Sequence, residues 1–61
     1  MSYSAEQKLA ALRRELKYRM RVFARRVVEG SMTQQTADYE MDIIHAMIAD
    51  YEALAAEERL L

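Results

Sequence analysis

Apolar residues recur at steps of three and four in the first half of the chain. They are Leu9, Leu12, Leu16, Met20, Phe23 and Val27. On a helix with 3.6 residues per turn this spacing keeps them within about 80° of arc, so they form one stripe. Ser4 precedes the stripe, and Gln7 follows three residues later, which is the order of a capping box. The pattern predicts a helix over about residues 4–29, closed by Gly30, which can adopt the left-handed conformation common at helix ends.

The second half of the chain carries a heptad pattern. Its apolar positions are Ala37, Met41, Ile44, Ile48, Tyr51 and Ala55. Thr33 can cap a helix that begins after it, because its hydroxyl can accept a hydrogen bond from a free backbone amide. Ile43, Met47 and Leu54 widen the apolar face to roughly 160°. The sequence therefore predicts a second helix over about residues 34–59 whose apolar face is wider than one facing helix covers.

The connection between the two predicted helices, residues 30–33, is short enough to force them antiparallel. The expected fold is all-α: one helical-hairpin domain over residues 1–61. A chain of 61 residues without cysteine has neither a large core nor a disulfide to stabilise it, so we expect two copies to associate into a four-helix bundle. The predicted core and dimer residues are Leu12, Leu16, Phe23, Met41, Ile44, Met47, Ile48 and Tyr51.

The basic and acidic residues are divided between the same two halves of the chain. Residues 1–30 hold eight basic and three acidic side chains, whereas residues 31–61 hold one basic and seven acidic. Antiparallel packing brings these opposite charges together, and exposed pairs of this kind contribute about 0.2 to 1 kcal/mol each. Their main predicted effect is on the register of the hairpin. The expected pairs are Arg21 and Arg25 with Asp38 and Asp42, and Arg13 or Arg14 with Asp50.

No motif in the chain predicts catalysis, a cofactor site or a metal site. Asp42 and His45 have the spacing of a helical metal motif, but one histidine cannot supply a usual ligand set, and both lie off the apolar face. Glu52, Glu57 and Glu58 belong to a solvated run of charge with no pocket implied. The expectation is a protein that is not an enzyme and carries no cofactor.

Two surfaces of the first predicted helix are candidates for binding. The outer face carries Tyr18 and Val22 one helical turn apart, with Arg14, Arg21 and Arg25 around them. Tyrosine and arginine are enriched in protein interfaces, so this set predicts a protein-binding patch, although a chance cluster and a dimer contact are the plain alternatives.

The alternative surface is a basic stripe spaced by four residues. It consists of Arg13, Lys17, Arg21 and Arg25. Such a stripe can meet phosphates, and it predicts nucleic-acid binding. The net charge of −1 and the lack of interleaved aromatic residues argue against this second interpretation.

The chain also resembles small proteins encoded by bacteriophages and prophages. The resemblance lies in Gly30-Ser31-Met32-Thr33, Ala37, Glu40, the apolar stretch 41–48 and Asp50-Tyr51, behind an arginine-rich first helix. It implies a protein that binds and inhibits or redirects a host protein, as an anti-defence or host-takeover regulator. It also implies a cytoplasmic location in the host bacterium. Absence of cysteine and of a long apolar run agrees with that location and with no membrane partner.

Overall fold

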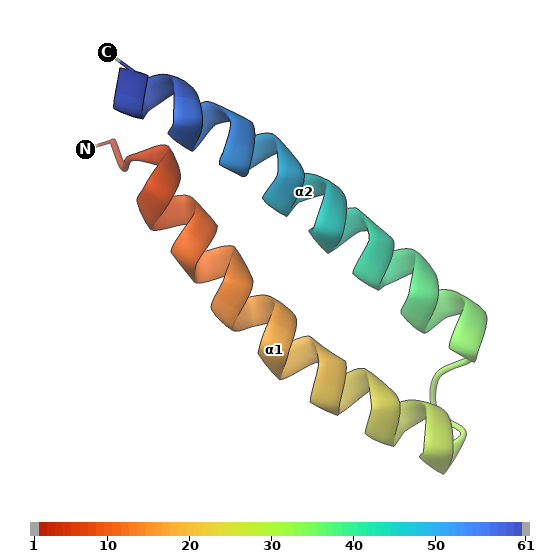
Figure 1. The fold of residues 1–61 in the computed structure, drawn as a ribbon. Coiled ribbons are helices and arrows are strands. Elements are labelled where there is room, and N and C mark those ends of the chain that lie inside the picture. The colour runs from red at the N-terminus through yellow and green to blue at the C-terminus, as the bar shows by residue number, and fades with distance from the viewer. Residues whose placement is uncertain (1, 61) are drawn as a thin grey trace.

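The chain folds into two antiparallel helices (Figure 1). The computed structural model describes residues 2–60. Helix α1 spans Ala5–Glu29 and helix α2 spans Gln34–Leu60. These bounds differ from the sequence expectation by one residue at the beginning of α1 and one at the end of α2. The predicted all-α hairpin is confirmed.

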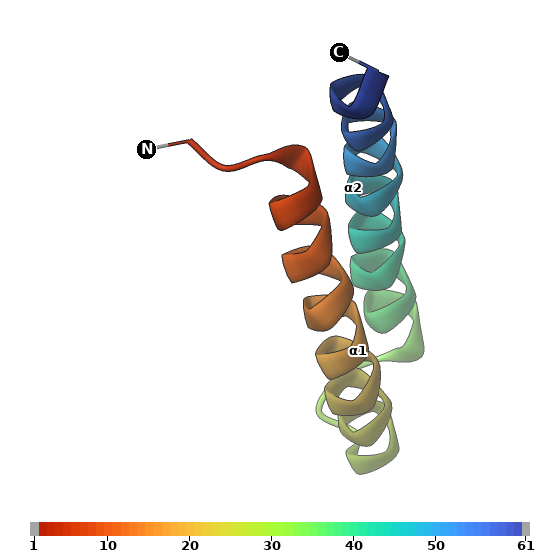
Figure 2. The same ribbon diagram turned by 60° about the vertical axis from the view of Figure 1, so that its left-hand side comes forward.

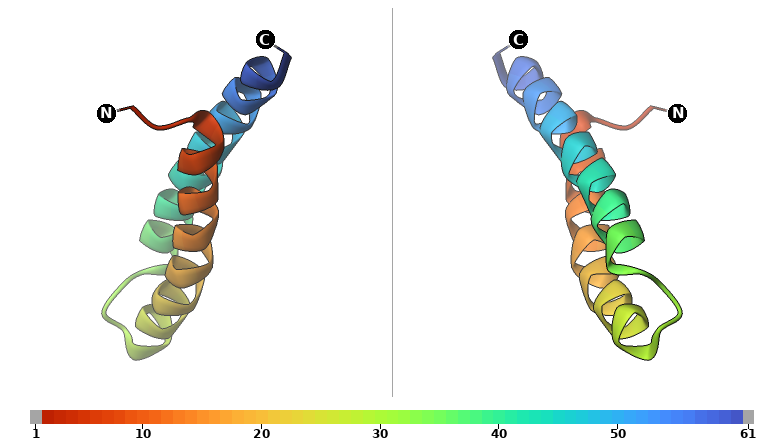
Figure 3. Two further views of the ribbon diagram at one scale, coloured as in Figure 1. Left: turned by 90° about the vertical axis from the view of Figure 1, so that its left-hand side faces the viewer. Right: turned by 90° about the vertical axis from the view of Figure 1, so that its right-hand side faces the viewer.

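The hairpin is a rod of 47 × 18 × 17 Å. The beginning of α1 and the end of α2 lie at one end of the rod, and the connection lies at the other (Figure 1). Seen from the side, the two helix axes are inclined to each other (Figure 3). Residues 2–4, which precede α1, project away from α2 (Figure 2).

The predicted capping box at the beginning of α1 is present. The Ser4 hydroxyl accepts a hydrogen bond from the Gln7 amide at 3.1 Å, and the Gln7 side chain accepts one from the Ser4 amide at 2.9 Å. Each bond satisfies a backbone donor that the first turn of a helix leaves without a partner inside the helix. The beginning of α1 is therefore fixed by residues three apart in the sequence.

The turn uses the glycine and the threonine that the sequence singles out. Gly30 has φ 83°, in the left-handed region. This conformation lets the Ser31 amide donate to the Arg26 carbonyl at 3.0 Å and the Gly30 amide donate to the Val27 carbonyl at 3.1 Å, which is the pattern of a Schellman motif. The Thr33 hydroxyl accepts from the Thr36 amide at 3.1 Å, as expected of an N-cap.

The core lies between the helices and is thin. Its buried members are Ala5, Leu9, Ala37, Ile44, Ile48 and Ala55. Half of them are alanines, so only three large apolar side chains are buried. Leu12, Leu16 and Tyr51 are partly buried against these core residues other than Ala37. Among residues 2–60 no side chain is less than 2% exposed, so a single hairpin encloses little apolar volume.

The remaining predicted core residues are less covered. Phe23 and Met41 are half-buried, and Met47 is 41% exposed. Met20 belongs to the predicted apolar stripe but is 55% exposed and borders a groove between the helices near the turn. Packing between α1 and α2 is therefore tighter toward the termini than toward the turn.

The exposed area of the hairpin is large for its mass. A folded monomer of 7.1 kDa is expected to expose about 4,100 Å², whereas this chain exposes 4952 Å². Its radius of gyration is 14.2 Å, and a compact domain of this length has about 10 Å. The excess, roughly 850 Å², is close to the area that each partner buries in a protein interface of standard size.

Candidate functional site

The outer face of α1 carries one exposed aromatic side chain within a basic surface. Tyr18 is 59% exposed, and Val22, one turn further on, is half-buried. Together with Arg25, Arg26 and Glu29 they line a shallow groove. The helix brings these side chains together, because residues three, four and seven apart share a face. Of the predicted patch, Tyr18, Val22 and Arg25 line this groove and Arg14 and Arg21 do not, whereas Arg26 and Glu29 are lining residues that the sequence reasoning missed.

Three basic side chains are engaged in ion pairs within residues 2–60. Arg13 contacts Glu52 at 3.0 Å and Arg59 contacts Glu6 at 3.5 Å, both between the helices. Arg19 contacts Glu15 at 2.8 Å within α1. All three pairs are largely exposed, so each contributes little to stability.

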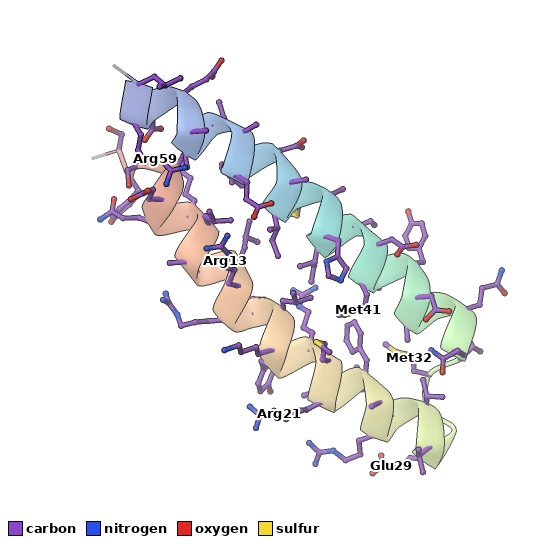
Figure 4. The ribbon with its side chains drawn as sticks, in the orientation of Figure 1. Arg13, Arg21, Glu29, Met32, Met41 and Arg59 are labelled. Atoms are coloured by element: carbon purple, nitrogen blue, oxygen red, sulfur yellow. The ribbon has the colours of Figure 1, made fainter. Side chains whose placement is uncertain are left out.

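The basic side chains on the outer face of α1 differ from these three in their ion pairing. In the part of the chain that the structure describes, no ion pair involves Arg14, Lys17, Arg21, Arg25 or Arg26. Figure 4 shows Arg13 on the side of α1 toward α2 and Arg21 on the side turned away from it. A guanidinium without an intramolecular carboxylate keeps its fork of donors available for an acidic group on another molecule.

The predicted pairs of Arg21 and Arg25 with Asp38 and Asp42 are wrong. On the α1 helical wheel Arg21 and Arg25 fall about 120° to 160° from the direction of Leu9, which faces α2. Arg13 falls about 40° from that direction and therefore reaches across. Among residues 2–60, the ion pairs between the helices lie toward the termini, and none lies near the turn.

The partner predicted for Arg13 is also wrong. Arg13 pairs with Glu52, two residues beyond the expected Asp50. Relative to Ile44, which faces α1, Glu52 lies about 80° to one side of α2 and Asp50 about 120° to the other. Glu52 and Asp50 are both acidic and lie at similar positions along the α2 axis. The side of the helix on which each lies decides which one pairs with Arg13.

A second exposed surface is the apolar flank of α2. Ile43, Met47 and Leu54 are 40%, 41% and 45% exposed. They lie within about 40° of one another on the α2 wheel and extend over roughly 16 Å of the helix. The wide apolar face predicted for this helix is thus present, and α1 leaves one edge of it uncovered.

A third surface, which the sequence reasoning missed, is an apolar groove between the helices near the turn. Met20, Phe23, Val27, Val28 and Met41 are among its lining residues. Val28 is 88% exposed and lies just outside the predicted stripe. The sequence signal for this groove is an apolar residue beside Val27 in the last turn of α1, and it is a weak signal because single exposed apolar residues are common.

Among residues 2–60, no group of three or more histidine, cysteine, aspartate or glutamate side chains is placed to hold a metal ion. His45 is exposed on α2. Over the same residues, neither helix combines the length and apolar character needed to cross a bilayer.

Comparisons with known proteins give no information on what these surfaces bind. No protein-family model matches the chain, and searches of curated proteins and of solved structures find no match.

Proposed function

We propose that this hairpin is a protein-binding module that acts by stoichiometric binding, without enzymatic turnover. The partner contacts the outer face of α1, with Tyr18 as the aromatic anchor and Val22 beside it. Arg14, Arg21 and Arg25 meet acidic groups of the partner. The observation that carries the proposal is an exposed tyrosine in a groove, surrounded by arginines that make no ion pair within the described chain.

Nucleic-acid binding by the stripe Arg13, Lys17, Arg21 and Arg25 is the second candidate. The free side chains of Lys17, Arg21 and Arg25 favour it. Against it, Arg13 is already paired with Glu52 at 3.0 Å, so within residues 2–60 the stripe has three cations without an ion pair instead of four. Among the same residues Tyr18 is also the one aromatic side chain on that face, whereas single-strand binding surfaces stack successive bases on several aromatic rings. The structure therefore favours a protein partner.

The same proposal includes a homodimer. Two hairpins pack through the flank formed by Ile43, Met47 and Leu54 and complete a four-helix bundle. Two observations support the dimer: the thin core, and an exposed surface roughly 850 Å² larger than that of a compact monomer. An interface of standard size buries about this area on each partner. In this bundle the half-covered core residues Leu12, Leu16 and Tyr51 gain neighbours along the edge that they share with the flank.

The biological context follows from the resemblance to small phage and prophage proteins. A short, cysteine-free binding module with an exposed arginine-rich face suits an inhibitor that blocks a host protein inside the bacterial cytoplasm. We therefore propose an anti-defence or host-takeover role, in which one acidic surface of a host protein is occupied.

The test is affinity capture from a host lysate with the wild-type protein and three variants, with and without nuclease. Tyr18→Ala and Val22→Ser change the proposed patch. Tyr39→Ala is the matched control, because Tyr39 is a tyrosine of similar exposure, 62%, on the other helix. Truncating an interface anchor costs about 2 kcal/mol or more, roughly thirtyfold in affinity.

The expected result is one host protein retained by the wild type and by Tyr39→Ala, and lost by Tyr18→Ala and Val22→Ser. Folding of each variant is checked by circular dichroism. Equal capture by all four proteins would exclude the patch. Capture abolished by nuclease would instead support the nucleic-acid alternative.

A further inference from the structure

The two helices carry opposite charges of nearly equal size. Helix α1 contains eight basic and three acidic residues, a net charge of +5, and α2 contains one basic and seven acidic, a net charge of −6. Within one hairpin the opposite charges attract each other, because α1 packs on α2. When a second hairpin is added, however, the charges distinguish between the possible ways of stacking.

Two hairpins can stack with a two-fold axis in either of two directions. An axis perpendicular to the helices places α1 on α1 and α2 on α2, so that like charges face each other and the two turns lie at opposite ends. An axis parallel to the helices places α1 of each copy on α2 of the other, with both turns at the same end. The second arrangement pairs a helix of net charge +5 with one of net charge −6 twice, and complementary fields of this kind select one geometry over another.

The two sides of the hairpin differ in what a second copy would cover. One side carries the exposed ion pairs Arg13–Glu52 and Arg59–Glu6, which apolar packing would have to desolvate. The other side carries the flank of Ile43, Met47 and Leu54, which α1 leaves uncovered. Apolar association therefore favours this second side.

On this second side α1 offers a mixed surface. Leu12 is half-buried there, and the Lys8 ammonium lies 5.7 Å from the centre of the Tyr51 ring. Arg19, also half-buried, continues the same edge toward the turn and is paired there with Glu15 at 2.8 Å within α1. Apolar and charged groups thus alternate along the surface of α1 that faces α2 of the other copy.

We propose that a second copy of this chain docks on the Ile43, Met47 and Leu54 flank in the parallel-axis arrangement, with α1 against α2 and both turns at one end of the bundle. This inference rests on the proposed dimer and adds its symmetry. Its functional consequence concerns the outer face of α1. The two Tyr18 grooves lie on diagonally opposite corners of the bundle, so the dimer binds two separate partner molecules. In the other arrangement the two grooves would lie on adjacent helices and form one wide surface.

Distances between nitroxide labels distinguish the two arrangements. The chain has no cysteine, so Ser31→Cys, in the exposed turn, introduces one label per copy. Interaxial distances of 8 to 10 Å place the two turns about 14 Å apart along the diagonal when they share an end. When they lie at opposite ends, the separation approaches the length of a 27-residue helix, about 40 Å. Ala46→Cys, an exposed position near the middle of α2, is the control, because its distance is similar in both arrangements.

The expected result is a short distance for both labels, within about 25 Å once the length of the label is included. A long distance for Ser31→Cys together with a short one for Ala46→Cys would overturn the inferred symmetry and leave the dimer standing. A monomeric mass by light scattering, with no dipolar coupling at either position, would overturn the dimer itself and the symmetry with it.

Discussion

The Glu58 carboxylate accepts a hydrogen bond from the Ala5 amide, with each carboxylate oxygen 3.2 Å from the nitrogen. The two residues are 53 positions apart, so this bond closes the hairpin at the end opposite the turn. It satisfies one of the free backbone donors in the first turn of α1 and places a negative charge at the positive end of that helix dipole. A residue of α2 thus adds to the capping of α1 that Ser4 and Gln7 begin.

Glu58→Ala should lower the stability of the hairpin. A hydrogen bond to a charged group contributes about 1.5 to 3 kcal/mol when well formed, and partial exposure reduces this to about 1 kcal/mol. For a chain of this size the Tm should fall by about 4 to 8 °C. Thermal unfolding followed by circular dichroism measures this change in Tm.

Glu57→Ala is the matched control for that change. Glu57 is exposed beside Glu58 and makes no hydrogen bond or ion pair among the described residues. Removing an acidic side chain near the carboxyl end of α2 also relieves an unfavourable interaction with the helix dipole, so its Tm should stay equal or rise slightly. Equal losses in the two variants would show that the Ala5 contact is unimportant.

Gly30→Ala should destabilise the turn through the backbone alone. A Cβ added at Gly30 meets no atom within 4 Å, so there is no steric clash with the rest of the chain. The φ of 83° is nevertheless unfavourable for alanine by about 1 to 2 kcal/mol. Gly30→Asn should lose less, because asparagine tolerates the left-handed region better. Chemical denaturation of the two variants gives the comparison, and a Gly30→Asn protein less stable than Gly30→Ala would contradict this account.

Ile48→Asp and Ile43→Asp should separate folding from association. Ile48 is 9% exposed in the core, and an unpaired charge there costs more than the about 3 to 5 kcal/mol that a core of this size supplies. We expect the helical circular dichroism signal of Ile48→Asp to be lost. Ile43 is 40% exposed on the flank, so Ile43→Asp should stay helical in the hairpin but become monomeric by light scattering. A helical, dimeric Ile43→Asp protein would exclude the flank as the interface.

Duplex DNA should not bind tightly at physiological salt. If Lys17, Arg21 and Arg25 do contact phosphates, the logarithm of affinity should fall with the logarithm of salt concentration with a slope of about 0.9 for each contact. Three free cations then predict a slope of about 3. Fluorescence anisotropy over a salt series measures the slope. Tight binding that disappears in Lys17→Glu, Arg21→Glu, with helicity unchanged, would favour the nucleic-acid function over the protein-binding one.

The sequence by itself determined the helices, their caps and the turn. Ser4 with Gln7, Gly30 with Arg26, and Thr33 with Thr36 each interact over three to four residues. Local spacing therefore fixes these contacts before any helix packs on another. The alternation of apolar positions at three and four residues identified the faces that meet, and the width of the α2 face identified the flank left exposed.

Only the tertiary structure decided which charges pair and how completely the apolar stripe is covered. Arg13 pairs with Glu52 and not with Asp50, Arg21 faces away from α2, and Met20 is exposed although it belongs to the stripe. These outcomes depend on the rotation of each helix about its axis and on the inclination between the two axes. A rotation of a few tens of degrees moves a long side chain from the facing helix to solvent, and no pair of residues close in the sequence sets that rotation. The Glu58 contact with Ala5 has the same origin, because it forms only after both helices are complete and packed.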